Sequence, residues 1–193
     1  MHSQLLSIID EENSLKEKEQ DLFCQYFHPK YLRKGDLFQR SGAYNHSIGF
    51  LKSGLVHYYT EKDGQETTKE FSKEGEFVTD YQSFVNKEPA TLNIQAIENC
   101  ELLVISHFDL QQLISCSEIG KNIGAYVLEH RFNTMIKHLL SSYMHSPMER
   151  YQYFLDNYDT LCKRIPQRMI ASYVGVKPQS LCRIRRRIIN NIS

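Results

Sequence analysis

Short stretches rich in β-branched and aromatic residues, separated by glycines, dominate residues 31–105 of this chain. Strands are expected at residues 48–51, 92–97 and 102–105, where such stretches are most continuous. A hairpin is expected over residues 54–71, because Asp63-Gly64 at its centre supplies the positive φ angles that a tight turn requires. Many short strands with regular turn signals predict a small sandwich or barrel rather than a helical bundle.

Helical patterns flank this β-rich region. A first helix is expected at residues 8–26, ending before His28-Pro29 because the residue preceding proline is driven out of the helical region. Ser106 and Asp109 form a capping box that predicts a short helix to about residue 113. A longer helix is expected at residues 118–143. Because an amphipathic helix of that length has few surfaces to cover it within one small chain, we expect it to form a dimer interface, with an ordinary core helix as the alternative.

A second capping box, Ser146-Pro147-Met148-Glu149, places a proline at the first position of another helix, which runs to about residue 157. A domain boundary is therefore expected near residues 141–146. The sequence predicts an α+β protein of three parts: a β-rich N-terminal part at residues 1–116, a long helix and linker at residues 117–144, and a helical C-terminal part at residues 145–193.

Residues 165–188 meet the steric demands of a helix-turn-helix. Ala171 is small enough for two helices to cross closely, and Gly175 follows where the turn needs a left-handed residue. Pro178 suits the first position of the second helix. Apolar residues at helical spacing lock the two helices together; they are Val174, Val176, Leu181 and Ile184.

Charge supports a polyanionic partner for this end of the chain. The net charge is zero overall, but residues 1–140 hold 14 basic and 20 acidic side chains, whereas residues 141–193 hold 9 basic and 3 acidic ones. A solvated basic face is the alternative on charge alone. A helix docked in the major groove would present Gln179, Ser180 and Arg183 to base edges, since Gln pairs with adenine and Arg with guanine. The remaining basic side chains are expected to contact phosphates; they are Lys177, Arg185, Arg186, Arg187 and Arg168.

These features together resemble the Crp/Fnr family of bacterial transcription regulators over almost the whole chain. Residues 34–36, 53–55, 63–66 and 74–77 resemble the glycine-punctuated β-roll of that family, residues 146–151 the start of its DNA-binding domain, and residues 165–185 its winged helix-turn-helix. The resemblance implies an N-terminal, jelly-roll-like β-roll sensor domain, a long dimerisation helix and a C-terminal winged helix-turn-helix. Because the chain stops soon after the second helix, the wing is expected to be short or absent.

By the same resemblance, a candidate effector pocket contains Gly75, Glu76, Asp80, Ala90 and Thr91. Members of the family that bind cyclic AMP use an arginine followed by Ser or Thr for the cyclic phosphate. The arginine position falls on Ala90 here, ahead of Thr91. Burying a phosphate without that guanidinium costs several kcal/mol, although Lys87 is a candidate to replace it. We therefore expect no usual response to cyclic AMP, and the effector is left open.

The sequence lacks the residue patterns that metal binding, haem binding or catalysis would require. The cysteines, at positions 24, 100, 116, 162 and 182, are odd in number and contain no C-x-x-C pair, so we expect free thiols and no metal or iron–sulfur centre. Cys100 and Cys116 are left as candidate oxidant sensors. The eight histidines offer no H-x-H pair for a metal-dependent barrel enzyme, and no nucleophile triad or phosphate-binding glycine loop occurs. A haem site would need an axial ligand, and single histidines such as His46 or His57 are more often surface or strand residues. We expect no catalysis and no cofactor.

The sequence thus predicts a cytoplasmic, homodimeric, sequence-specific DNA-binding regulator that recognises an inverted repeat. No signal peptide or membrane span is expected, because the first residues lack a basic region and no apolar run approaches 20 residues. Activation would add RNA polymerase as a partner, but no residue pattern identifies a surface for it. The alternative is a ligand-binding or interaction protein on a decayed regulator scaffold that binds no specific DNA.

Overall fold

The computed structural model describes residues 5, 21 and 24–192. The helix predicted at residues 8–26 lies outside the described residues, except for residues 21 and 24–26, which are helical. No statement about the remainder of that helix follows.

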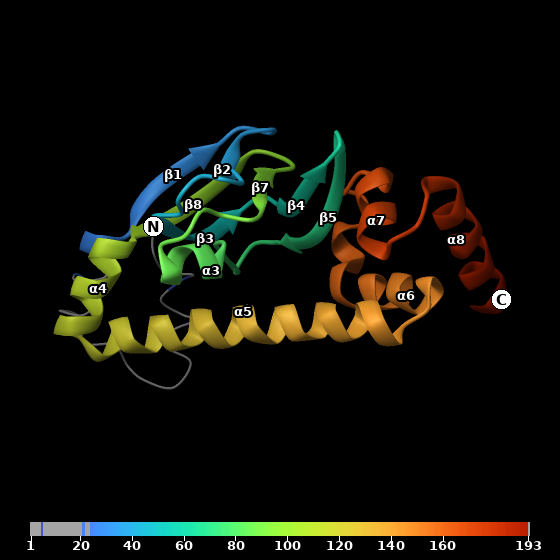
Figure 1. The fold of residues 1–193 in the computed structure, drawn as a ribbon. Coiled ribbons are helices and arrows are strands. Elements are labelled where there is room, and N and C mark those ends of the chain that lie inside the picture. Colours follow the sequence, from blue (N-terminus) through green and yellow to red (C-terminus); the bar gives the residue numbers. More distant parts are fainter. Residues whose placement is uncertain (1–4, 6–20, 22–23, 193) are drawn as a thin grey trace. The chain divides into compact units, whose positions relative to one another are not determined.

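Two four-stranded sheets form a β-roll (Figure 1). The first sheet has the spatial order β1 (His28–Leu32), β8 (Cys100–Ser106), β3 (Ser47–Ser53) and β6 (Phe77–Val78). The second has the order β2 (Leu37–Gln39), β7 (Asn93–Ala96), β4 (Val56–Lys62) and β5 (Gln65–Ser72). The pairs β1–β8, β3–β8, β3–β6 and β2–β7 are antiparallel. The predicted small β architecture, with strands at β3, β7 and β8, is confirmed.

The predicted hairpin consists of β4, β5 and a two-residue turn between them. Asp63 and Gly64 have φ angles of 53° and 74°. Two consecutive positive φ angles give a turn whose twist matches that of the flanking strands, which is why the Asp-Gly pair predicted the hairpin.

The helices after the β-roll begin where their caps predict. They are α4 (His107–Cys116), α5 (Glu118–Met144), α6 (Pro147–Tyr158), the 3-10 turn η1 (Asp159–Leu161), α7 (Gln167–Val174) and α8 (Pro178–Ile192). At the start of α4, the backbone N–H of Asp109 donates to Ser106 Oγ at 3.0 Å. At the start of α6, the N–H of Ser146 donates to Glu149 Oε2 at 2.7 Å, and the N–H of Glu149 donates to Ser146 Oγ at 3.4 Å. Both capping boxes are therefore confirmed.

Two features differ from what the residue pattern or the family resemblance implies. Helix α3 (Tyr81–Asn86) interrupts the β-roll, where no helix was predicted from the residue pattern. The winged form that the resemblance implies is not found in residues 145–192, which contain helices and connecting turns but no strand. The expectation of a short or absent wing therefore describes this part of the chain. Residues 178–192 continue as one helix beyond the predicted recognition helix.

Two clusters of buried side chains fill the β-roll. One lies among β3, β6, β8, α4 and the first half of α5, with Phe50, Phe77, Leu103, Ile123 and Val127 at its centre. The other lies inside the roll and includes Leu51, Val56, Tyr58, Ile94 and Leu102. The first cluster attaches α4 and the beginning of α5 to the first sheet.

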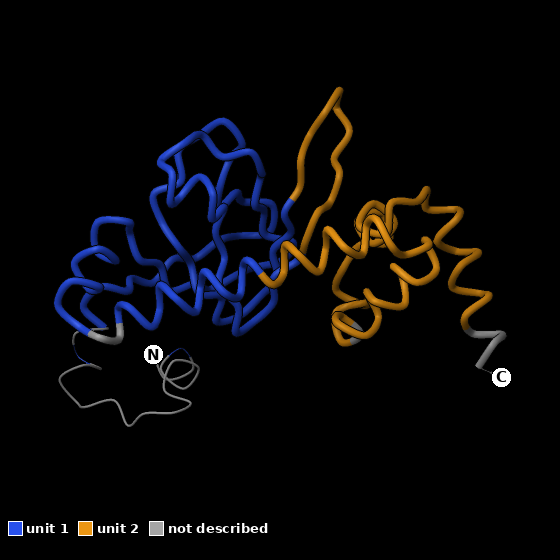
Figure 2. Tube along the Cα trace, turned by 60° about the horizontal axis from the view of Figure 1, so that its bottom comes forward, with its two compact units in different colours: residues 1–58, 71–132 blue, residues 59–70, 133–193 orange. Residues whose placement is uncertain are grey.

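The chain divides into two compact units (Figure 2). The first comprises residues 1–58 and 71–132, and therefore most of the β-roll with the first half of α5. The second comprises residues 59–70 and 133–193, and therefore the outer part of the β4–β5 hairpin, the second half of α5 and helices α6 to α8. The predicted three-part division at residues 116 and 144 stays a prediction.

Candidate functional site

Helices α7 and α8 are joined by a tight turn at Gly175. This residue has φ 77° and ψ 34°, in the left-handed region that glycine enters without strain. The N–H of Gly175 donates to the carbonyl of Ser172 at 3.0 Å, and the N–H of Val176 donates to that of Ala171 at 2.9 Å. This pair of bonds is the Schellman arrangement, which ends α7 and reverses the chain into α8.

Apolar packing fixes the angle between these helices. Ala171 is 1% exposed, consistent with the close helix crossing that its small side chain predicted. The other buried side chains of this part come from α6, η1, the connection between η1 and α7, α7 and α8; they are Tyr151, Phe154, Leu161, Ile165, Ile170, Val174 and Leu181. These residues form the small core of the second unit.

Arg150 of α6 holds the turn from outside, and the sequence analysis missed it. Its Nε donates to the carbonyl of Val174 at 2.8 Å, and its Nη1 donates to that of His145 at 3.0 Å. A Cβ on Gly175 would lie 3.4 Å from Arg150 Nη2, so a side chain there would press on this guanidinium. In the sequence, Arg150 is distinguished only by its position in the first turn of α6. That position does not predict which groups its guanidinium contacts.

Two of the three residues predicted to contact DNA bases, Gln179 and Arg183, are exposed on one side of α8, whereas Ser180 is half-buried. At 100° per residue, Gln179, Arg183 and Arg186 lie within about 60° of one another around the helix. All three are exposed, and Arg183 Nη2 donates to Ser180 Oγ at 3.3 Å. The structure therefore brings Gln179, Ser180 and Arg183 together on the first two turns.

The residues predicted to contact phosphates spread more widely. Arg185 lies on the flank of α8, and its Nη1 donates to Gln167 Oε1 at the start of α7 at 2.7 Å. Lys177 and Arg168 are exposed at the start of α8 and on α7, and Arg187 is exposed on α8. The basic side chains thus occur on both helices of the predicted motif rather than on α8 alone.

The outer part of the β4–β5 hairpin contacts α7 within the second unit. The backbone N–H of Thr68 donates to Ser172 Oγ at 2.9 Å, and that hydroxyl donates to the carbonyl of Glu66 at 3.5 Å. Nearby, the rings of His138 and Tyr173 have centroids 5.5 Å apart. Burial lowers the pKa of His138, against a smaller opposing effect of Glu70. A strand of the sheet and a helix of the predicted DNA-binding part therefore share hydrogen bonds.

The candidate effector residues surround the start of α3. Asp80 is 5% exposed. Its carboxylate accepts hydrogen bonds from the backbone N–H groups of Ser83, at 3.2 Å, Thr91, at 3.1 Å, and Leu92, at 3.4 Å. Amide groups of this kind bind anions at the starts of helices. Here the chain's own carboxylate already accepts those bonds.

The other candidate effector residues are engaged in local structure. The N–H of Gly75 donates to the carbonyl of Leu51 at 2.8 Å, and Glu76 Oε2 accepts from the N–H of Lys73 at 3.2 Å. Ala90 is 3% exposed. The structure thus brings Asp80 and Thr91 into contact, while Gly75 and Glu76 belong to a separate turn bonded to β3.

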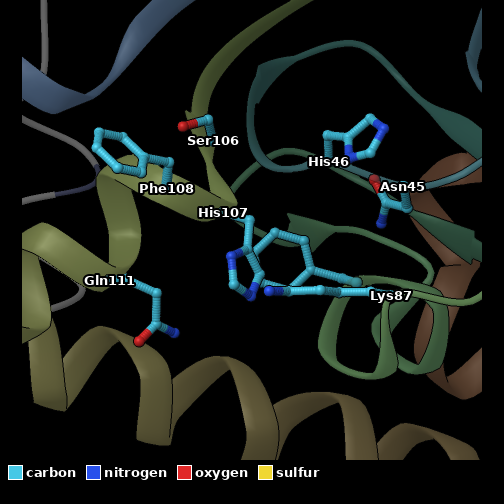
Figure 3. Close-up of a pocket in the computed structure, with 8 residues that line it drawn as sticks. Asn45, His46, Lys87, Ser106, His107, Phe108 and Gln111 are labelled. Atoms are coloured by element: carbon cyan, nitrogen blue, oxygen red, sulfur yellow. The ribbon is translucent and has the colours of Figure 1, made fainter.

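A cavity of about 560 Å³ opens beside α3 and α4 (Figure 3). It is lined by Asn45, His46, Phe84, Lys87, Ser106, His107, Phe108 and Gln111. The Lys87 and His107 side chains approach one another in its centre. The sequence analysis named only Lys87 of these eight residues as a ligand contact, because the others come from segments that are distant along the chain.

Metal and thiol chemistry find little support among the described residues. They contain no group of three or more His, Cys, Asp or Glu side chains placed to hold a metal ion. Of the two candidate oxidant sensors, Cys100 is buried and its thiol lies 3.2 Å from the carbonyl of Glu98, whereas Cys116 is exposed at the end of α4. No described helix is long and apolar enough to cross a membrane.

Comparison with known proteins links the chain to one domain family. The family model of the cyclic nucleotide-binding domain matches residues 29–116. No curated protein sequence matches the chain. The matched residues span the β-roll and α4, so the matched region coincides with most of the first compact unit.

Solved structures share the fold over most of the chain. FixK2 from Bradyrhizobium japonicum is 15% identical, with a TM-score of 0.74 over 86% of this chain and 85% of that one. CLP, a c-di-GMP-responsive global regulator from Xanthomonas campestris, is 19% identical, with a TM-score of 0.68 over 91% and 93%. A protein from Eubacterium rectale described as a Crp/Fnr-family transcriptional regulator is 16% identical, with a TM-score of 0.68 over 92% and 85%. The chain therefore shares the fold of these solved structures.

The contact between Thr68 and Ser172 gives a first testable prediction. Replacing Ser172 with Ala removes the acceptor of the Thr68 N–H, so we expect amide hydrogen exchange at Thr68 to accelerate about fivefold to tenfold, as the loss of a bond worth about 1 kcal/mol implies. Exchange measured by NMR tests this, with Ser180→Ala as the control, since the Ser180 hydroxyl lies on α8 and accepts from Arg183. Equal protection of Thr68 in all three proteins would contradict the contact.

Proposed function

We propose that the protein is a homodimeric, sequence-specific DNA-binding transcriptional regulator. The premise is that residues 29–116 match the cyclic nucleotide-binding domain family, within a fold shared with Crp/Fnr regulators. The observation that carries the proposal is the pair α7–α8, joined by a left-handed glycine, with Gln179 and Arg183 exposed on the second helix. The family and the structural neighbours are regulatory proteins, which argues against an enzyme.

The charge of the C-terminal part supports nucleic acid as the partner. Residues 141–193 carry 9 basic and 3 acidic side chains. A helix in the major groove reads base edges with its first turns, while basic groups around it contact phosphates. Gln179, Ser180 and Arg183 occupy the first two turns of α8, and the basic side chains on α7 and α8 flank them.

A second copy of the chain is the proposed partner of α5. This helix is apolar on two faces. Ile123 and Val127 are buried in the core of the first unit. On another face, Leu128, Phe132, Met135 and Leu139 are exposed by 47%, 54%, 58% and 48%. Their spacing of four, three and four residues is the apolar repeat of a two-stranded coiled coil, which fits an identical helix. Two recognition helices related by a two-fold axis would read half-sites about 34 Å apart.

The effector is proposed to be something other than cyclic AMP bound in the usual way. The position that carries an arginine in cyclic AMP-binding members of the family holds Ala90. In addition, Asp80 places a carboxylate on the backbone amides of Thr91 and Leu92. A bound phosphate in this region would meet that carboxylate without a guanidinium to offset the repulsion.

We predict that Arg183→Ala lowers affinity for an operator selected from a random duplex pool by about 1–3 kcal/mol and relaxes the preference at one base pair in each half-site. Fluorescence anisotropy on operator and random duplexes measures both effects. Lys177→Ala is the control, since the loss of a phosphate contact weakens both duplexes alike and reduces the salt dependence. If Arg183→Ala also weakens both duplexes equally, Arg183 contacts phosphate. If no duplex is enriched and no salt-dependent binding occurs, even with cell extract added, the protein is not a DNA-binding regulator.

We predict that the double variant Met135→Glu, Leu139→Glu is monomeric at micromolar concentration, because four charges would be brought together in the seam of the coiled coil. Light scattering after size exclusion should give about twice 22.7 kDa for the native chain and about 22.7 kDa for the variant. Lys137→Glu, an exposed change on the same helix, should leave the dimer intact. A native chain that is monomeric in this measurement would refute the proposed interface.

Titration calorimetry with cyclic AMP tests the effector proposal. We expect no binding with micromolar affinity, because Ala90 supplies no charge to the phosphate and Asp80 opposes it. A dissociation constant in the micromolar range would show that another residue takes the role of the missing arginine.

A further inference from the structure

The cavity beside α3 and α4 has the size and composition of a ligand site. Its volume of about 560 Å³ lies within the range of about 300–1,000 Å³ typical of small-molecule pockets. Neither Glu76 nor Thr91, two of the residues aligned with the cyclic nucleotide site, lines it. Apart from Lys87, the cavity therefore shares no lining residue with the site that the family resemblance implies.

Basic side chains define the charge of this cavity. His46, Lys87 and His107 line it, and none of its eight lining residues is acidic. Burial lowers the pKa of His107, and electrostatic interactions with Lys87 and His46 lower it further, so both groups are close enough to act on His107. The nearest acid on α4, Asp109, accepts a hydrogen bond from Ser106 Oγ at 2.6 Å. Among the described residues, Lys87 forms no ion pair with a carboxylate.

Local structure positions these groups. Lys87 follows the last turn of α3 in the left-handed conformation, with φ 57° and ψ 41°. His46 stacks on Tyr44, and its carbonyl accepts a hydrogen bond from the N–H of His107 at 2.8 Å. Asn45 and Ser106 already have partners within the protein, so Lys87, His46, His107 and Gln111 are the polar groups left for a ligand.

A smaller cavity of about 180 Å³, whose lining residues are mostly apolar in type, adjoins the basic one, and the two share Phe84, His107 and Gln111. Its other lining residues are Ile48, Tyr81, Val85, Leu110, Ile114, Gly124 and Val127. We propose that the two cavities form one binding site for a small organic anion with an apolar part. The anionic group contacts Lys87, His46 and His107, and the apolar part lies among Leu110, Ile114 and Val127.

This site also contacts α5, because Gly124 and Val127 belong to that helix. A ligand in the apolar cavity therefore touches the helix to which the proposed function assigns dimerisation. That link to regulation rests on the proposed function, whereas binding of the anion does not.

Calorimetry with 2-naphthoate, against its neutral analogue 2-naphthamide, tests the site on the full chain. We expect saturable, millimolar or tighter binding of naphthoate and at least tenfold weaker binding of the amide. Lys87→Asn should weaken naphthoate at least tenfold and leave the amide unchanged, since Asn tolerates the left-handed conformation at this position. Lys34→Asn, which removes an exposed lysine from a turn outside the cavity, is the matched control.

Imidazole signals in ¹H–¹³C spectra locate the bound anion. Saturating naphthoate should raise the pKa of His107, whose signal is identified by its loss in His107→Asn. Gly124→Leu should fill the apolar cavity and weaken naphthoate while circular dichroism stays unchanged. The proposal is overturned by absence of saturable binding up to millimolar naphthoate, by equal effects of Lys87→Asn and Lys34→Asn, or by binding that survives Gly124→Leu. None of these measurements involves DNA, so failure here and failure of the proposed function are separable.

Discussion

Helix α5 has two apolar faces, and each of them needs apolar packing partners. This requirement constrains how the rest of the chain packs and associates. One face is satisfied internally, since Ile123 and Val127 pack into the core beneath the first sheet. The other exposes Leu128, Phe132, Met135 and Leu139 at a coiled-coil spacing, which a soluble monomer would leave in water. Both faces belong to one helix, and the division between the two compact units falls within it, after residue 132. The smaller cavity, the core of the first unit and the proposed dimer interface therefore all involve α5.

The carboxylate of Asp80 changes the chemistry expected of the sensor domain. A backbone cradle at the start of α3 suits a phosphate, yet here an internal anion already accepts its hydrogen bonds. Together with the absence of an arginine at position 90, this carboxylate supports the proposal that cyclic AMP is not bound in the usual way. Positive charge is found instead at Lys87, beside His46 and His107 in the cavity next to α3. The structure is thus compatible with an anionic effector bound in the cavity beside α3 and α4 rather than at the cyclic nucleotide site.

Features encoded by neighbouring residues were predictable, whereas those built across the chain were not. The Asp63-Gly64 turn, the caps at Ser106 and Ser146 and the left-handed Gly175 each depend on a few adjacent residues, and all were predicted. Arg150 acts on Val174, 24 residues away, so no local pattern indicated it. Helix α3 is too short for its periodicity to stand out, and its cap, Asp80, bonds to residues 91 and 92. The winged form was implied by family resemblance alone, and in residues 178–192 the chain continues as α8 instead.

The hydrogen bonds between the hairpin and α7 have a strength suited to regulation. Strand β4 is anchored in the core of the roll through Val56 and Tyr58, and β5, its partner in the hairpin, donates from Thr68 to Ser172 of α7. A single such bond contributes about 0.5–1.5 kcal/mol. Allosteric coupling energies are typically about 1–3 kcal/mol. A hydrogen bond with a free energy in this range would favour one position of α7 without fixing it. A much stronger contact would keep α7 in one position whether or not a ligand was bound. The strands of the hairpin connect this contact covalently to the core of the roll at Tyr58.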